Sequence, residues 1–137
     1  MELPFGTTQD ADFMFTKLIV GDLEQAAAFY GAAFGLVEMH RVEAQIEGRA
    51  LAEVVYQPTY QGGPLFILGQ YLDAEAPAGG EVILGFASGD VDACLARVEA
   101  AGGRVVENPA NLPAGVPRYA FVRDPEGHLV QVSQRLG

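Results

Sequence analysis

The chain has 137 residues, of which half are hydrophobic and 19% are charged, the composition of a globular domain large enough to bury a core. Its 18 acidic and 8 basic residues give a net charge of −10 at pH 7, and such a surface repels phosphate backbones and anionic membranes. No apolar run approaches the roughly 20 residues that span a bilayer, and no signal peptide is recognisable, so we predict a cytoplasmic protein that binds neither nucleic acid nor membrane.

The first half of the chain predicts one helix among four strands. Residues 1–11 have no pattern and are expected to form a loose tail, and residues 12–20 then alternate between two faces as a strand does. Asp22 starts a helical pattern that ends at Gly35, because an Asp carboxylate accepts from the first backbone N–H groups and glycine commonly ends a helix. Three more strands are expected at residues 37–44, 51–57 and 65–71.

The second half predicts the same order after a joint rich in Pro and Gly at residues 76–80. Asp90 starts its helix and Gly102-Gly103 ends it, and strands are expected at residues 81–87, 104–107, 119–123 and 128–134. The segment Asp124-Pro125-Glu126-Gly127 has the residues of a type I turn between the last two strands. The single cysteine, Cys94, excludes an intrachain disulfide, and we interpret it as a small apolar residue on the inner face of the second helix.

The second half is also a faint copy of the first. Gly21-Asp22-Leu23 corresponds to Gly89-Asp90-Val91 at a distance of 68 positions, and Gly35 corresponds to Gly103 at the same distance. A repeat of this length is a supersecondary unit used twice. We therefore predict a single α+β domain, residues 1–137, built from two tandem βαβββ units at residues 12–74 and 80–134.

Four motifs of the sequence together resemble the vicinal oxygen chelate superfamily, which includes glyoxalase I, bleomycin-resistance proteins, fosfomycin-resistance enzymes and extradiol dioxygenases. They are the Gly-Asp-Leu helix start, the Phe29-Tyr30 pair, the Gly-Gly helix end and the Asp-Pro-Glu-Gly-His hairpin. The resemblance covers residues 12–134. It implies two βαβββ units whose curled mixed sheets enclose a ligand cleft, and it implies a homodimer.

Many members of that superfamily bind a divalent metal through His, Glu or Gln, and the metal polarises substrate oxygens. The resemblance places the four ligand positions at Phe15, Leu68, Ile83 and Gln131. Three of these are apolar, and one neutral amide does not hold a metal. The strand faces that would hold it carry Phe15, Phe66, Leu68, Ile83 and Leu129 instead. We therefore predict an apolar cleft with no metal and no other cofactor.

The polar residues of these strands have two interpretations each. Lys17, on the face of Phe15, either pairs with an anionic group of a ligand or reaches solvent along its alkyl stem. Gln70 and Gln131 either orient a ligand through their amides or bond to each other or to water. Tyr119, with Phe121, either stacks on a planar ligand or packs in the core.

Two further residues have acid–base chemistry, and we expect both at the surface. A histidine side chain such as that of His40 can transfer protons near neutral pH. Glu53 either holds a cationic ligand or acts as a base if it is buried, or it lies on the solvent side of an edge strand. No second acid has a convincing place beside Glu53, so no general acid–base pair is predicted. His128 follows a turn glycine, where a polar residue has a structural role.

Three hypotheses follow. The first is a metal-free binding protein for a small, partly apolar or aromatic molecule, similar to the bleomycin-resistance branch. Its acidic surface either favours a cationic or aromatic compound or serves solubility alone. The second is an enzyme of glyoxalase I or dioxygenase type with a displaced metal site, for which His40, Glu53, Gln70 and Gln131 are the available ligands. The third is a subunit or a regulatory partner of another protein, with a vestigial cleft. We predict no catalytic residue, and the predicted ligand-binding residues are Phe15, Lys17, Phe66, Leu68, Gln70, Ile83, Tyr119 and Gln131.

Overall fold

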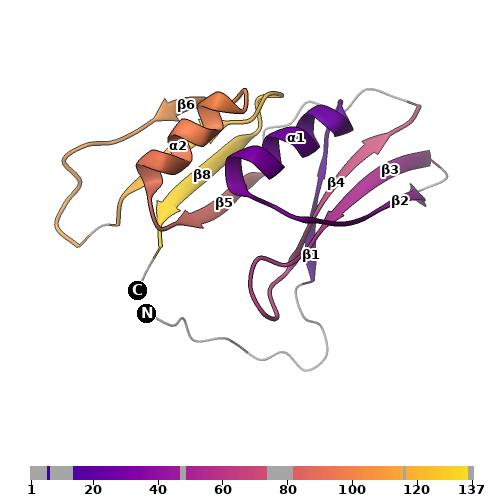
Figure 1. Cartoon of the computed structure of the whole chain (residues 1–137), viewed down its shortest axis with the longest axis horizontal. Helices are drawn as coiled ribbons and strands as arrows, with labels where there is room; N and C mark the ends of the chain where they lie inside the picture. Colours follow the sequence, from indigo (N-terminus) through magenta and orange to yellow (C-terminus); the bar gives the residue numbers. More distant parts are fainter. Residues whose placement is uncertain (1–5, 7–13, 47–48, 74–81, 116, 136–137) are drawn as a thin grey trace.

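Two halves of the chain have the same order of elements (Figure 1). The computed structural model describes residues 6, 14–46, 49–73, 82–115 and 117–135. The first half contains β1 (Phe15–Ile19), α1 (Leu23–Phe34), β2 (Glu38–Ile46), β3 (Arg49–Tyr56) and β4 (Leu65–Tyr71). The second contains β5 (Ile83–Ser88), α2 (Val91–Ala100), β6 (Arg104–Glu107), β7 (Tyr119–Arg123) and β8 (Leu129–Gln134). The expected tail, apart from Gly6, and the expected joint lie outside the described residues.

The predicted repeat is confirmed. β1 begins at Phe15 and β5 at Ile83, which are 68 positions apart. The predicted strands at 65–71, 104–107 and 119–123 have the bounds of β4, β6 and β7, and the ends of the other strands differ from their predictions by at most three residues. Strand ends are less certain from sequence because tertiary pairing decides where a ladder stops.

The helix ends are confirmed with their capping bonds. The Asp22 carboxylate accepts from the backbone N–H of Gln25 at 3.0 Å, and Asp90 accepts from Ala93 at 3.0 Å. The first helix ends at Gly35, whose φ of 71° lies in the left-handed region that favours glycine. The Asp124–Gly127 turn is also confirmed, because the Gly127 N–H donates to the Asp124 carbonyl at 2.9 Å.

Each half forms its own four-stranded mixed sheet. The first sheet has the order β1-β4-β3-β2 and the second the order β5-β8-β7-β6. In each sheet the first pair of strands is parallel and the other pairs are antiparallel. β1 and β5 are therefore equivalent edge strands, and each is followed along the chain by a helix.

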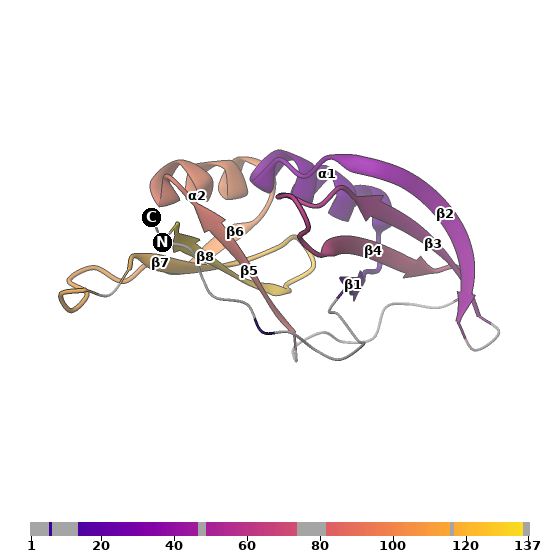
Figure 2. The ribbon, with the colours of Figure 1, turned by 90° about the horizontal axis from the view of Figure 1, so that it is seen from below.

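The two helices join the halves into one core. α1 and α2 lie side by side, on the same side of both sheets (Figure 2). Buried residues of both helices and both sheets form one cluster, which includes Phe29 and Tyr30 of α1 and Val98 of α2. Cys94 is 2% exposed in this cluster, which confirms its predicted place on the inner face of α2, and burial raises the pKa of its thiol. No helix in the described part of the chain is long and apolar enough to cross a membrane.

Every strand has two faces, which we call the helix face and the open face. The helix face carries the residues that pack in the core with α1 and α2, such as Leu18, Val54 and Val130. The open face carries the alternate residues, because successive side chains of a strand point to opposite sides. Strand register then fixes the face of each predicted site residue.

Candidate functional site

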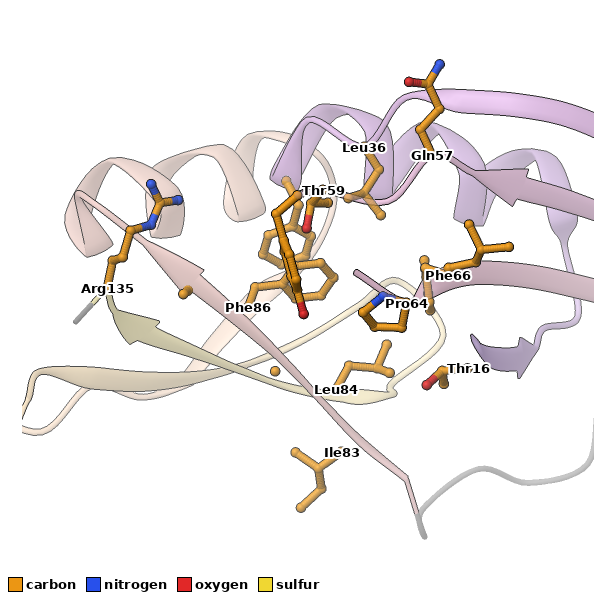
Figure 3. Close-up of a pocket in the computed structure, with 15 residues that line it drawn as sticks. Thr16, Leu36, Gln57, Thr59, Pro64, Phe66, Ile83, Leu84, Phe86 and Arg135 are labelled. Atoms are coloured by element: carbon orange, nitrogen blue, oxygen red, sulfur yellow. The ribbon is translucent and has the colours of Figure 1, made fainter. Parts of the chain in front are cut away.

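A cleft of about 780 Å³ lies between the two halves (Figure 3). Its walls come from segments that are distant in sequence: the end of α1, the loop before β4, the start of β4 and the edge strand β5. This volume is in the range of pockets that bind small molecules. The lining residues are Thr16, Phe34, Leu36, Gln57, Thr59, Tyr60, Pro64, Leu65, Phe66, residues 83–87 and Arg135.

Aromatic side chains form much of the cleft wall. Phe34 and Phe86 are stacked, with ring centroids 4.1 Å apart and an interplanar angle of 2°. Phe66 packs on Tyr30 at 5.2 Å and on Tyr56 at 5.9 Å, so the wall is continuous with the core. Rings held in this way offer apolar surface at little cost in conformational entropy.

The rim of the cleft is polar and more open. Tyr60 is 65% exposed, and its ring lies over Gly63, where a Cβ atom would approach ring carbons to 2.8 Å. Gln57, Thr59 and Thr16 add neutral hydrogen-bonding groups. The site therefore combines an apolar interior with a few polar groups at its mouth, as ligand pockets do.

The predicted site residues do not form one group. Phe66 and Ile83 line the cleft. Phe15 and Lys17 lie on the open face of the first sheet, and Ile83, Tyr119 and Gln131 lie on the open face of the second. Phe66, Leu68 and Gln70 lie on the helix face, so the expectation that they share a surface with Phe15 is wrong.

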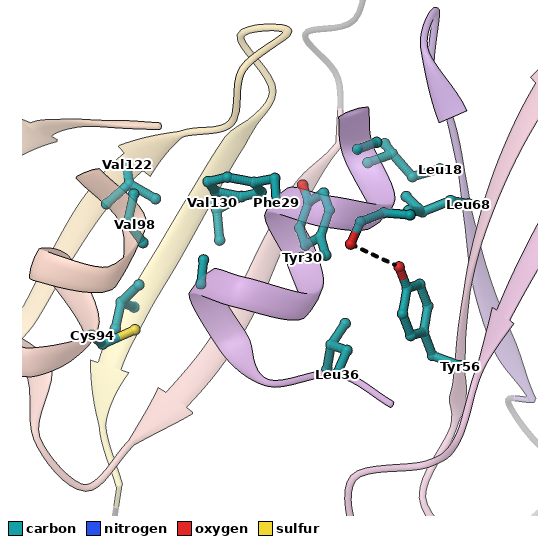
Figure 4. Close-up of a cluster of buried hydrophobic side chains, with 14 of the residues drawn as sticks. Leu18, Phe29, Tyr30, Leu36, Tyr56, Leu68, Cys94, Val98, Val122 and Val130 are labelled. Atoms are coloured by element: carbon teal, nitrogen blue, oxygen red, sulfur yellow. Dashed lines mark hydrogen bonds between the residues drawn. The ribbon is translucent and has the colours of Figure 1, made fainter. Parts of the chain in front are cut away.

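Strand register explains this correction. Leu68 pairs with Leu18 and Val54, and it is fully buried in the core beside them (Figure 4). On β4, it is Ile67 and not Leu68 that pairs with Lys17 and lies on the open face. A change of one residue in the assumed alignment moves a strand residue to the other face of the sheet.

The two glutamines bond within the protein. Gln70 Oε1 accepts from the backbone N–H of Leu23 at 2.9 Å, so its amide oxygen stabilises the start of α1. Gln131 Nε2 donates to Ser133 Oγ at 3.0 Å, and its amide oxygen accepts no hydrogen bond from any described residue. Tyr119 packs edge-to-face with Phe121 at 5.9 Å on the same open face.

The donor positions that the resemblance assigns to a metal do not fit one. Phe15 and Ile83 have no donor atom, and β4 presents apolar Ile67 on the open face where a ligand would be needed. Gln131 alone offers an oxygen, and a divalent cation needs several. Within the described residues, no group of three or more His, Cys, Asp or Glu side chains has the arrangement to hold a metal ion.

The open face of the first sheet contains a buried ion pair instead. Lys17 Nζ contacts Glu53 Oε2, and Glu53 is 6% exposed. The expectation that Glu53 lies on the solvent side is therefore wrong. Lys17 also lies over the Phe15 ring, 5.6 Å from its centroid. A carboxylate in an apolar strand is stable when a cation neutralises it. That cation comes from β1, which is separated from β3 in the sheet by β4.

A second buried polar group links the two halves. Asp124 accepts hydrogen bonds from the Tyr30 hydroxyl, from His128 Nδ1 and from the backbone N–H groups of Glu126 and His128, at 2.8 to 3.0 Å. Burial alone raises the pKa of Asp124, but the bonds from His128 outweigh it and lower the pKa. The same bond raises the pKa of His128. The structural role predicted for His128 is compatible with this arrangement.

Sequence reasoning missed most of the cleft. Phe34, Tyr60, Phe86 and Arg135 were in no predicted site, because each belongs to a different segment. His40, by contrast, is exposed on the edge strand β2, where we expected it. The sequence offered one signal for the cleft. Phe34 lies on the apolar face of the predicted helix, and Phe86 lies in a predicted apolar strand.

Comparison with known proteins identifies relatives over nearly the whole chain. The model of the Glyoxalase/Bleomycin resistance protein/Dioxygenase superfamily matches residues 13–132. A protein of Vibrio cholerae described as a probable lactoylglutathione lyase is 28% identical over 124 residues, which cover 88% of each chain.

Solved structures share the fold. A glyoxalase family protein from Bacillus cereus has a TM-score of 0.75 at 18% identity, over 99% of this chain and 100% of the other. TnmS3, an antibiotic binding protein from a Streptomyces species, has a TM-score of 0.68 at 23% identity, over 95% and 100%. Glyoxalase I from Zea mays has a TM-score of 0.74 at 21% identity; 92% of this chain matches, which spans only 48% of the maize protein.

Proposed function

The chain belongs to the Glyoxalase/Bleomycin resistance protein/Dioxygenase superfamily, and within it we propose a protein that binds a small, partly apolar or aromatic molecule without a metal. The ligand occupies the cleft between the two halves. We propose no catalytic residue. The cytoplasmic location stays a prediction from the sequence.

One observation carries this proposal: apolar side chains stand where members of the superfamily place metal ligands. Phe15, Ile83 and the open-face residue Ile67 supply no donor, while the nearby cleft of about 780 Å³ is lined with aromatic rings. The cleft is hollow, whereas a vestigial site would be filled by side chains. The antibiotic binding protein TnmS3 gives a precedent for ligand binding on this fold.

We further propose that the protein forms a homodimer. Phe15 is 42% exposed and Ile83 57% exposed, and both lie on edge strands with the open face of their sheet beside them. Exposed apolar residues at a sheet edge are stabilised when a second molecule covers them. Sedimentation equilibrium of the wild-type protein and of a Phe15→Glu, Ile83→Glu variant tests this, and a monomeric wild-type protein would reject it.

A lyase is the second candidate, because relatives at 28% identity are described as probable lactoylglutathione lyases. A displaced metal site would have to use His40, Glu53, Gln70 and Gln131. Glu53 is paired with Lys17, Gln70 is bonded at the start of α1 on the helix face, and Gln131 belongs to the other sheet. Because Gln70 lies on the helix face and Lys17 neutralises the Glu53 carboxylate, the four side chains do not form one ligand set, which weakens this candidate.

Calorimetry separates the two candidates. Protein treated with a chelator is titrated with a panel of aromatic compounds, and in parallel with Zn²⁺ and Ni²⁺. The binding proposal expects heat from at least one compound, no stoichiometric metal, and no change in S-lactoylglutathione when it is incubated with the metal-loaded protein. A stoichiometric metal together with turnover of S-lactoylglutathione would support the lyase and reject the binding proposal.

A further inference from the structure

The charge that lines the cleft is opposite in sign to that of the protein. The chain carries a net charge of −10, yet the described lining residues include no carboxylate and one charged side chain, that of Arg135. At physiological salt, charges more than about 8 Å from a bound ligand are largely screened. The nearby charge of Arg135 therefore determines which sign of ligand charge the cleft favours. The acidic composition suggested a cationic ligand, and the cleft indicates the reverse.

Arg135 has a fixed backbone and no competing partner among the described residues. Its N–H donates to the Ser88 carbonyl at 2.8 Å, directly after β8 ends, which ties it to the edge strand β5. None of the ion pairs in the described part of the chain includes its guanidinium. Figure 3 shows Arg135 at one end of the cleft, beyond Phe86.

A smaller hollow of about 370 Å³ adjoins this end of the cleft, and its lining residues also carry a net positive charge. It shares Phe34, Phe86 and Arg135 with the cleft and adds Arg97 and Asp90. The Asp90 carboxylate is occupied at the start of α2, where it accepts from the Ala93 N–H at 3.0 Å. The two arginines therefore outnumber the one carboxylate around Phe34 and Phe86.

We propose that the ligand of this cleft is a planar aromatic molecule with an anionic oxygen group, which Arg135 binds while the rings contact Phe34 and Phe86. This inference rests on the proposed function and names its ligand class. A guanidinium presents parallel N–H donors that match a carboxylate or sulfonate. The aromatic wall supplies apolar contact for the rest of the ligand.

Two fluorescent probes with the same ring system test this inference. 8-Anilinonaphthalene-1-sulfonate is an aromatic anion, and N-phenyl-1-naphthylamine is its counterpart without the sulfonate. Both are titrated into the wild-type protein and into Arg135→Gln, Phe86→Leu and Arg104→Gln variants. Arg104 is exposed on β6 and outside the cleft, so its variant makes the same change in net charge at another place. Near-UV circular dichroism checks that each variant keeps its fold.

The expected pattern is specific to the anion. Arg135→Gln weakens binding of the sulfonate probe by roughly tenfold, the effect of losing one charge-assisted hydrogen bond, and changes the neutral probe less than twofold. Phe86→Leu weakens both probes, and Arg104→Gln weakens neither. An equal effect of Arg135→Gln on both probes, or an equal effect of the two arginine variants on the sulfonate, overturns the inference and leaves the proposed function standing. If neither probe binds the wild-type protein, the proposed function fails and the inference with it.

Discussion

The Tyr30 hydroxyl donates a buried hydrogen bond of 3.0 Å to Asp124 Oδ2, and this bond joins the helix of one half to the hairpin of the other. Burial, and then the Asp124 carboxylate, raise the pKa of this phenol, so it is a hydrogen-bond donor at neutral pH. Tyr30→Phe removes the bond but leaves Asp124 with His128 and two backbone donors. We expect the free energy of unfolding to fall by about 1–2 kcal/mol, measured by urea denaturation.

Tyr119→Phe is the matched control for that variant, because the Tyr119 hydroxyl has no hydrogen bond to any described residue. A Tyr30→Phe protein as stable as Tyr119→Phe would show that the bond contributes nothing.

The pair of Asp124 and His128 predicts a dependence of stability on pH. The hydrogen bond to Asp124, opposed by burial, raises the pKa of His128 above its ordinary 6.5, so the unfolded state loses this proton first. Its contribution is fully present below pH 6.5 and is lost as pH rises through the folded pKa. The lowered pKa of Asp124 has the opposite effect on the pH dependence of stability. The stabilisation by Asp124 is present above pH 3.8 and is lost as pH falls through the folded pKa.

The pair therefore stabilises the fold most between about pH 4 and 6.5. We expect the melting temperature to fall between pH 6 and 8, and to fall less in His128→Gln, which cannot titrate. His40→Gln controls for the other histidine. An identical decrease in the wild-type protein and in His128→Gln would contradict this prediction.

The ion pair of Lys17 and Glu53 predicts a strongly non-additive double mutant. Lys17→Met leaves a buried carboxylate without its cation and is expected to cost about 3–5 kcal/mol. Glu53→Leu costs less, because the Lys17 side chain is 22% exposed and its amine can turn to water. The double variant replaces the pair by apolar side chains and should lie within about 1 kcal/mol of the wild-type protein. Additive losses in a denaturant-based double-mutant cycle would refute the pairing.

Gly103 has no room for a side chain. A Cβ atom there would approach the Arg123 carbonyl oxygen, a Phe29 ring carbon and a Val98 methyl to 2.8 Å each. We expect Gly103→Ala to lower the free energy of unfolding by about 1–3 kcal/mol through overpacking. Gly85→Ala is the control, because its Cβ meets no atom within 4 Å. Equal stability of the two variants would be inconsistent with this crowding.

Local signals in the sequence predicted the parts of the fold that depend on neighbours in the chain. Asp22, Asp90 and Gly35 fix helix ends through bonds within one turn, and the Asp124–Gly127 turn closes on itself. Repetition of the same signals at 68 positions was enough to identify two similar units. For these elements, local chemistry and tertiary packing agree.

Strand faces and the cleft could not be predicted in the same way. Leu68 and Ile67 are both apolar, and only pairing with β1 shows which of them meets the core. Glu53 looked solvated because its cation, Lys17, lies on another strand. The cleft is lined by Phe34, Tyr60, Phe86 and Arg135, which come from four segments of the chain. No local sequence pattern indicates that these residues lie close together.

The Glu126 carboxylate accepts from the backbone N–H groups of Gly21 and Asp22 at 2.8 Å, across 105 and 104 positions of the chain. The N-terminus of α1 therefore receives part of its capping from the last hairpin. During synthesis at about 5–20 residues per second, Gly21 precedes Glu126 by roughly 5–20 s. During that interval the first helix has been synthesised but Glu126 has not. The interval between the synthesis of Tyr30 and that of Asp124 is almost as long. A nascent chain of this protein can assemble its first sheet early, but the bonds that join the two halves close only when translation is nearly complete.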